Sequence, residues 1–182
     1  EEAELDVLMV LHDDSGHSGP ASSWAARAEV GDPVALWGPR TAFHPPKGTE
    51  HLVLAADETG LPAVAGIIDW MAPAMTATVL AEVADASEHQ DLPEHPGVEV
   101  TWLHRDGAAP GTTSLLGDAA RALPPFGPHT YVWGGGETKA MTAVRRHVRD
   151  DRGLAREDAD LIAYWRHRAT PEGDVEPEGY GR

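Results

Sequence analysis

The chain contains 182 residues, of which 41% are hydrophobic and 24% charged, so it can form one domain, or one domain and part of a second. Its 14 basic and 30 acidic residues give a net charge of −16, which argues against nucleic acid and anionic membranes as partners. Because the chain has no cysteine, disulfides, thiolate zinc sites and thiol redox chemistry are excluded, and any redox reaction requires a bound cofactor.

The first part of the chain is expected to contain short elements separated by turn-forming residues. The pattern predicts a strand over 5–12, a short helix over 22–28, and a second short strand that follows a turn within 30–36. A connector over 41–50, containing proline and glycine, then indicates a domain boundary. No apolar run approaches the roughly 20 residues of a membrane span, and the acidic start differs from a signal peptide, so a cytoplasmic location is expected.

From residue 51 onward, apolar strand-like runs alternate with helical patterns. Strands are predicted over 51–56, 76–84, 98–104, 129–133 and 160–165, and helices over 60–72, 113–123 and 139–151. This alternation predicts an α/β fold with a five-stranded parallel sheet and right-handed crossovers. The Pro-, Gly- and Glu-rich segment 169–182 is expected to be disordered.

The turn between the first of these strands and its helix is the first candidate binding site. Thr59 is a plausible N-cap, Gly60 allows close approach to the backbone, and Pro62 fits the first helical turn. Free amides at a helix start suit a nucleotide phosphate. The alternative is an ordinary strand-to-helix turn.

Three consecutive glycines, Gly134, Gly135 and Gly136, precede Glu137 and predict a second such turn after the fourth strand. Glycine lets a flat or large group approach the backbone, although a turn that only needs positive φ would also explain it. Neither turn has the GxGxxG or GxxxxGK[ST] pattern, so a standard dinucleotide fingerprint and a nucleoside triphosphatase are not supported. Ligands of a parallel sheet bind at the carboxyl ends of its strands, near the switch in strand order.

Several motifs, spread along the chain in the right order, resemble the siderophore-interacting proteins, which are flavin-dependent ferric-siderophore reductases of the ferredoxin-reductase superfamily. These motifs are GPASSWA at 19–25, WGPR at 37–40, ADETGLPA at 56–63, AEV at 81–83, WLHR at 102–105, GGE ending at Glu137, and YWR at 164–166.

Members of this family have a flavin-binding β-barrel followed by a nicotinamide-nucleotide domain. The barrel's upstream Arg-containing flavin motif has no counterpart here, so the resemblance implies a C-terminal piece of a longer enzyme. Residues 1–46 would be the last strands and short helix of the FAD-binding barrel, 47–168 the NAD(P)-binding domain of ferredoxin-reductase type, and 169–182 a disordered tail.

The resemblance assigns residues to FAD, because the amides and hydroxyl at a short helix start suit a pyrophosphate. The implied FAD residues are His12, Gly19, Pro20, Ala21, Ser22 and Trp24. A plain N-cap would explain Ser22 equally well, and ordinary packing would explain His12 and Trp24.

A second set is implied to meet NADH or NADPH: Asp57, Glu58, Thr59, Gly60, Leu61, Glu82, Asp85, Arg105, Gly134, Gly135, Gly136, Glu137, Tyr164 and Trp165. Asp57 and Glu58 would repel a phosphate, so we expect them to face the ribose, a backbone amide or solvent. The carboxylate of Asp85 suits the ribose diol of NADH, whereas Arg105 is the nearest basic candidate for the 2′-phosphate of NADPH. Both nucleotides stay open at this point, and the two aromatic residues could equally be core residues.

The implied substrate is a ferric siderophore, and the reaction needs no general acid or base because electrons pass through the cofactors. Arg40, Lys47, Arg166 and Arg168 could line its site, although surface solubility explains each of them as well. The ten histidines show no i, i+4 pair with a third ligand at hand, so no structural zinc or di-iron site is expected.

Three hypotheses follow. The intact protein is an FAD-dependent ferric-siderophore reductase that uses NADH or NADPH, or it is a flavin or ferredoxin-type reductase with another acceptor. Alternatively, the chain is a non-catalytic domain that only holds a nucleotide or a partner.

Overall fold

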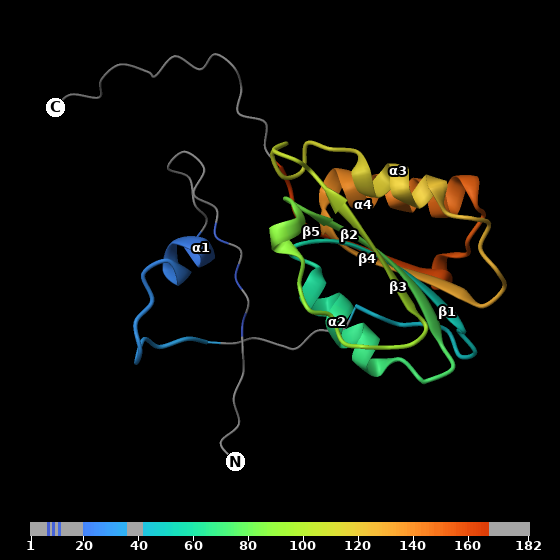
Figure 1. The fold of residues 1–182 in the computed structure, drawn as a ribbon, viewed down its shortest axis with the longest axis horizontal. Coiled ribbons are helices and arrows are strands. Elements are labelled where there is room, and N and C mark those ends of the chain that lie inside the picture. Colours follow the sequence, from blue (N-terminus) through green and yellow to red (C-terminus); the bar gives the residue numbers. More distant parts are fainter. Residues whose placement is uncertain (1–6, 8, 10, 12–19, 36–41, 168–182) are drawn as a thin grey trace.

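One parallel sheet organises the chain (Figure 1). The computed structural model describes residues 7, 9, 11, 20–35 and 42–167. The sheet has the strand order β3-β2-β1-β4-β5, and all four pairings are parallel, as the sequence predicted. The strands are β1 (His51–Asp57), β2 (Thr76–Val83), β3 (Val98–His104), β4 (Thr130–Glu137) and β5 (Ala159–Trp165).

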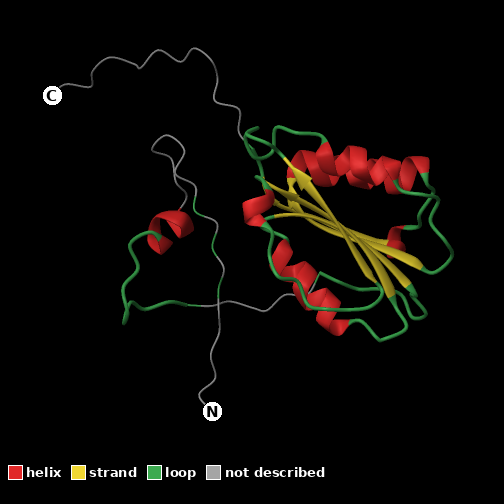
Figure 2. Cartoon of the chain, viewed as in Figure 1, coloured by secondary structure: helices red, strands yellow, loops and turns green. Residues whose placement is uncertain are grey.

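Helices cover both faces of this sheet (Figure 2). The helix α2 (Leu61–Trp70) lies on one face, and α3 (Leu115–Ala122) and α4 (Thr138–Arg146) lie on the other. Along β1, Leu52 and Leu54 join the core beside α2, whereas Val53 and Ala55 join the core beside α3 and α4. Successive strand residues point to opposite faces, so a strand covered on both sides is apolar along its length, as β1 is from Leu52 to Ala56.

The remaining elements are short. They are the helix α1 (Pro20–Ala25), the 3-10 turns η1 (Ala86–Glu88) and η3 (Arg156–Asp158), and the π-helical turn η2 (His147–Asp151), which continues α4. Gly153, at φ 71°, follows η2 and ends the helical segment at the predicted position. None of the helices in the described part of the chain is long and apolar enough to cross a membrane.

The N-terminal predictions are met only in part. The helix α1 begins at Pro20 rather than Ser22, because proline fits the first helical position. Val34 and Ala35 are irregular, so the short strand predicted there is wrong for these two residues. Most of the strand predicted over 5–12, and all of 169–182, lie outside the described residues.

The largest correction concerns the three glycines, which form the end of β4 rather than a turn. A Cβ at Gly134 would lie 2.6 Å from Cδ2 of Leu161, and one at Gly136 would lie 2.7 Å from Oδ2 of Asp57. Each of these positions therefore requires glycine because a neighbouring side chain lies against the backbone. Close approach, and not positive φ, explains these two residues.

The connector before β1 is attached to the face of the sheet that carries α2. The Phe43 ring packs edge-on against Trp70 and Tyr131, at centroid distances of 5.0 and 5.6 Å. The indole of Trp133 donates to the Ala42 carbonyl over 2.9 Å. The segment just before the domain boundary expected from the sequence is thus packed on the sheet.

Candidate functional site

The strand order places a switch point between β1 and β4. From β1 the chain proceeds through β2 to β3 at one edge, and it then returns to β4 and β5 on the other side. Ligands of open α/β sheets bind at the carboxyl ends of the strands beside such a switch. The β1–α2 turn and the end of β4 meet there, so close that a Cβ on Gly60 would collide with the carbonyl oxygen of Gly135. The two glycine-containing segments that the sequence singles out are therefore neighbours.

Asp57, at the end of β1, connects three strands at this edge. Its Oδ1 accepts from the amide of Thr59 over 3.0 Å and from the Thr59 hydroxyl over 2.5 Å. Its Oδ2 accepts from the amide of Glu137 and from the indole of Trp165, each over 2.8 Å. The residue is only 4% exposed, and its carboxylate faces protein donors, which agrees with the expectation that it would meet a backbone amide.

The role expected for Thr59 is different in the structure. Gly60 is the N-cap of α2, and no side chain caps this helix. The Thr59 hydroxyl instead donates to the Asp57 carboxylate, because a hydrogen bond to an ionised acceptor is stronger than one between two neutral groups. At the start of α2, the amides of Gly60, Ala63 and Val64 donate to backbone carbonyls. Pro62 has no amide hydrogen, so among the described residues the Leu61 amide is the one at this helix start without a hydrogen-bond partner.

The start of α4 is occupied by the protein itself. Glu137 caps it, and Oε2 accepts from the amides of Lys139 and, over 3.2 Å, Ala140. Its Oε1 accepts from the amide of His167 over 3.1 Å. Of the two helix starts beside the switch point, α2 is consequently the one that can receive an anion.

Arg105, which follows β3, lies between two carboxylates. Its guanidinium donates to Glu58 and lies 3.7 Å from Oε1 of Glu82, and its side chain is 3% exposed. Burial lowers the pKa of Arg105, but the hydrogen bond and charge of Glu58, together with the charge of Glu82, raise this pKa more. Burial raises the pKa of Glu82, against the opposing hydrogen bond from Thr113 and the charge of Arg105.

The two aromatic residues that end β5 have different surroundings. Tyr164 is 45% exposed, and its ring lies over Gly135, where an added Cβ would come within 3.0 Å of it. Burial, helped by the charge of Asp57, raises the pKa of Tyr164. Trp165 is tied to Asp57 through its indole, and its carbonyl accepts from the Thr138 hydroxyl over 2.8 Å. Tyr164 is therefore the aromatic side chain that a flat ligand can reach.

The loop between β3 and α3 belongs to the site, although sequence reasoning named only its first residue, Arg105. Thr113 donates to Glu82 over 2.8 Å. Gly111, at φ 74°, approaches Glu137 and His167 so closely that a Cβ would lie within 2.9 Å of both. A cavity of about 10 Å³ lies beneath the loop, with room for about one water. Only the turn-forming Pro110-Gly111 pair hints at this loop, and no local pattern reveals its distant partners.

At the end of β2, Asp85 is exposed and accepts from the Ser87 amide over 2.8 Å and from its hydroxyl over 2.6 Å. These hydrogen bonds to Ser87 lower the pKa of Asp85. Beside it, His89 stacks on Trp102 at 4.3 Å, and its Nε2 lies 2.7 Å from Nε2 of His104. This edge is thus polar and accessible.

The other predicted residues are distributed as follows. Leu61 is fully buried in the core beside α2, so only its backbone can meet a ligand. Within α1, Ser22 is buried, and Pro20, Ala21 and Trp24 belong to the same helix. His12, Gly19, Arg40 and Arg168 lie outside the described residues.

Two of the basic residues assigned to the siderophore are described, and they lie at opposite ends of the sheet. Lys47 precedes β1, whereas Arg166 follows β5, and both are exposed. Because all strands are parallel, these two residues cannot line one small site together. Among the described residues, no group of three or more His, Asp or Glu side chains is placed to hold a metal ion.

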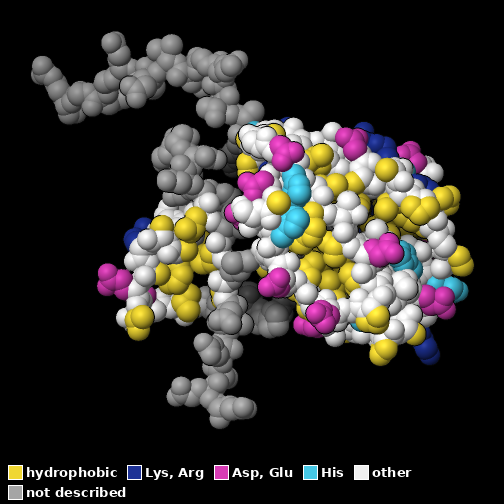
Figure 3. Space-filling model, viewed as in Figure 1, with side chains coloured by type: hydrophobic (Ala, Val, Ile, Leu, Met, Phe, Trp, Pro, Cys, Tyr) yellow, Lys and Arg dark blue, Asp and Glu magenta, His cyan; other side chains and the backbone are white. Residues whose placement is uncertain are grey.

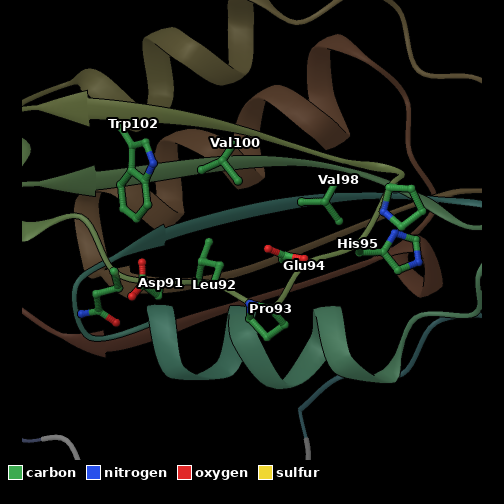
Figure 4. A pocket seen from close by; sticks show the side chains of 10 residues that line it. Asp91, Leu92, Pro93, Glu94, His95, Val98, Val100 and Trp102 are labelled. Carbon is green, nitrogen blue, oxygen red and sulfur yellow. The ribbon is translucent and has the colours of Figure 1, made fainter.

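A larger groove, of about 660 Å³, lies away from the switch point, between the edge strand β3 and the segment 90–96. In Figure 4, Val98, Val100 and Trp102 point toward Leu92 and Pro93. On the molecular face in Figure 3, acidic side chains are spread widely, and Lys and Arg lie mostly near the outline. The ionisable residues that line this groove, Asp91, Glu94 and His95, do not include an arginine paired with carboxylates of the kind found at the switch point.

Comparisons with known proteins agree with this geometry. A sequence model described as "Siderophore-interacting protein" matches residues 49–168, and one described as "Siderophore-interacting FAD-binding domain" matches residues 1–43. A siderophore utilization protein from T. fusca is 39% identical, with a TM-score of 0.72, over 89% of this chain and 60% of that one. A ferredoxin reductase of carbazole 1,9a-dioxygenase, 15% identical with a TM-score of 0.51 over 68% of this chain and 37% of that one, shares the fold.

Two curated relatives are similar over most of the chain. An uncharacterized protein of Mycobacterium tuberculosis is 32% identical over 93% of this chain and 62% of its own length. The ferric acinetobactin reductase of Acinetobacter baumannii is 29% identical over 90% of this chain and 56% of its own length. The chain thus spans less than two thirds of the relatives it matches. With a match over residues 49–168 and a parallel sheet of ferredoxin-reductase type, the chain belongs to the siderophore-interacting protein family.

Proposed function

We propose that this chain is the nucleotide-binding part of an FAD-dependent ferric-siderophore reductase, which takes electrons from NADH or NADPH and reduces chelated Fe(III) to Fe(II). The observation that carries the proposal is the uncapped start of α2 at the switch point, next to the exposed ring of Tyr164. The name of the relative from Acinetobacter baumannii, ferric acinetobactin reductase, supports the same reaction class.

Different residues of the chain bind different parts of the nicotinamide nucleotide. The pyrophosphate is received by the start of α2, through the positive end of the helix dipole and the Leu61 amide, since a carboxylate of Glu137 caps the start of α4. The glycine backbone around Gly135 leaves a flat surface on which Tyr164 can contact a ring. Asp57 fixes this arrangement because it joins the β1–α2 turn to β4 and β5.

FAD fits the other part of the chain, because the FAD-binding family model matches residues 1–43 and Ser22 is buried in α1. When bound, FAD accepts a hydride and delivers single electrons. One NADH or NADPH provides two electrons and therefore suffices for two Fe(III) ions, with release of one proton. The chain's task is to bind and orient, and no side chain needs to act as a general acid or base.

The ferric siderophore is expected at the same edge of the sheet. Arg166 follows β5 and is exposed there, so it can attract an anionic chelate that the acidic surface otherwise repels. Iron bound as Fe(II) is held more weakly by ligands selected for Fe(III), and the metal can then leave. Lys47, at the opposite end, takes no part in this proposal.

A spectroscopic titration tests the function. The purified chain is mixed with FAD, and excess FAD is removed. NADH or NADPH is then added without oxygen, followed by a ferric siderophore. We expect retained flavin absorbance, bleaching by the nucleotide, and recovery of absorbance as Fe(II) forms. A Tyr164→Ala variant should bleach at least tenfold more slowly, while Tyr180→Ala, in the tail, should not.

The other outcomes separate the competing functions. Bleaching that ferricyanide or ferredoxin reverses, but no ferric siderophore reverses, would indicate a reductase with another acceptor. Nucleotide binding without bleaching would indicate a non-catalytic binding domain. A chain that binds neither flavin nor nucleotide would overturn the proposal.

A further inference from the structure

Arg105 is the cation nearest to the nucleotide-binding edge on the side of β2 and β3. In the described part of the chain, no other Arg or Lys directly follows β1, β2 or β3. A site that accepts the 2′-phosphate of NADPH uses such a cation, whereas an acidic residue at the end of the second strand binds the ribose diol of NADH. Whether the Arg105 guanidinium is free to contact a phosphate therefore decides which nucleotide this edge favours.

The guanidinium of Arg105 is already committed to two carboxylates. It donates to Glu58, it lies 3.7 Å from Glu82, and its side chain is 3% exposed. Its Nε is buried without a hydrogen-bond partner among the described residues. The adjoining cavity, of about 10 Å³, holds about one water and cannot admit a phosphate group.

Around Arg105, the neighbouring side chains add negative charge to this edge of the sheet and do not offset the charge of its two carboxylates. Asp85 lies at the end of β2, 25 positions after Gly60, and its exposed carboxylate points to no cation in the hydrogen-bond network, only to Ser87. The imidazoles of His89 and His104 lie close to Asp85. Their Nε2 atoms are 2.7 Å apart while their ring centres are 5.0 Å apart, so the nitrogens face each other and one donates to the other.

We propose that the ion triad Glu58–Arg105–Glu82 makes this nucleotide site selective for NADH over NADPH. The inference rests on the proposed function, since it assumes that a nicotinamide nucleotide binds at the switch point. A 2′-phosphate would bring a further negative charge close to Glu58 and Asp85, with Arg105 neutralised and buried. Selectivity then arises from repulsion and not from a dedicated contact with NADH.

Calorimetric binding of NADH and of NADPH to the 182-residue chain tests the triad. We expect the wild type to bind NADH at least tenfold more tightly than NADPH. In Glu58→Gln the ratio of the two affinities should fall at least fivefold, because loss of this negative charge favours the more negatively charged NADPH more than NADH.

Two further variants make the result specific. Glu157→Gln removes the same charge at an exposed position before β5, at the opposite end of the sheet, and should leave the ratio unchanged. Asp85→Asn, also exposed, should reduce the ratio even if Glu58→Gln fails to fold. Equal affinities, or tighter binding of NADPH by the wild type, would overturn the selectivity. An unchanged ratio in both Glu58→Gln and Asp85→Asn would do the same. If neither nucleotide binds, the proposed function itself is wrong.

Discussion

At the scale of single residues, glycine and buried carboxylates shape the site. Gly136 lies against Asp57, and a Cβ there would come within 2.7 Å of Oδ2. Glycines before a helix look like a turn in the sequence, but the structure uses them in a strand because Asp57 needs the space. The motif could be found from the sequence, whereas its reason could not, since Asp57 is 79 positions away.

Replacing Gly136 by alanine should lower the free energy of unfolding by about 1–3 kcal/mol, the usual cost of overpacking. Gly66, in α2, offers a matched control because an added Cβ meets nothing within 4 Å. Gly66→Ala should leave stability unchanged or raise it by up to about 1 kcal/mol. Urea denaturation of both variants measures the difference, and equal effects would contradict the role given to Gly136.

Glu82 should make stability depend on pH. Burial, the largest cause, raises its folded-state pKa above 4.5, so the folded state holds this proton more tightly than the unfolded state. The stabilisation from proton binding is complete below pH 4.5 and is lost as pH rises through the folded-state pKa. Between about pH 5 and about pH 8, the wild type should lose stability relative to Glu82→Gln. Urea midpoints at both pH values test this, and a constant difference would count against it.

At the scale of elements, hydrophobic pattern determined most of what could be predicted. All five strands were predicted. The central strands are buried and continuous apolar runs, whereas the edge strand β3 carries polar residues and is partly exposed. The helix α2 has the predicted apolar face. The hydrogen bonds between polar groups of different strands could not be predicted. The amide of Glu137 and the indole of Trp165 both donate to Asp57 from residues that are 80 and 108 positions away, on the neighbouring strands β4 and β5, and no local pattern reveals such partners.

Asp57→Asn should loosen the junction of β1, β4 and β5. An amide has one acceptor oxygen, and its NH₂ would face a donor where Oδ1 or Oδ2 now accepts. Loss of charged hydrogen bonds should cost at least about 3 kcal/mol. Asp69→Asn, exposed on α2, is the matched control and should be neutral in the same unfolding experiment. If both variants unfold alike, Asp57 is not the connection we describe.

At the scale of the whole molecule, the parallel strands place residues that precede a strand and residues that follow one at opposite ends of the sheet. Motif order was enough to identify the family and the fold, because it survives changes in the loops. Motif order did not show that Lys47 and Arg166 lie at opposite ends, since that follows only from the strand direction.

This separation predicts unequal effects of two charge deletions. With flavin-loaded protein at low salt, Arg166→Ala should slow reduction of an anionic ferric siderophore by on the order of threefold or more, because electrostatic attraction at the nucleotide edge is weakened. Lys47→Ala should not change this rate. The rate of flavin bleaching by NADH is measured alongside and should be equal in both variants. A larger effect of Lys47→Ala would place the siderophore at the other end.

The contacts that close the site also impose an order on its assembly. Asp57 meets Glu137 across 80 positions and Trp165 across 108. During synthesis, β1 can pair with β2 and β3 early, but its other edge stays open until β4 is made. Because such distant pairings form slowly, the junction of β1, β4 and β5 around Asp57 is the last part of the sheet to be completed. A nascent chain that stops before Trp165 would therefore have most of the sheet but an incomplete set of hydrogen bonds to Asp57.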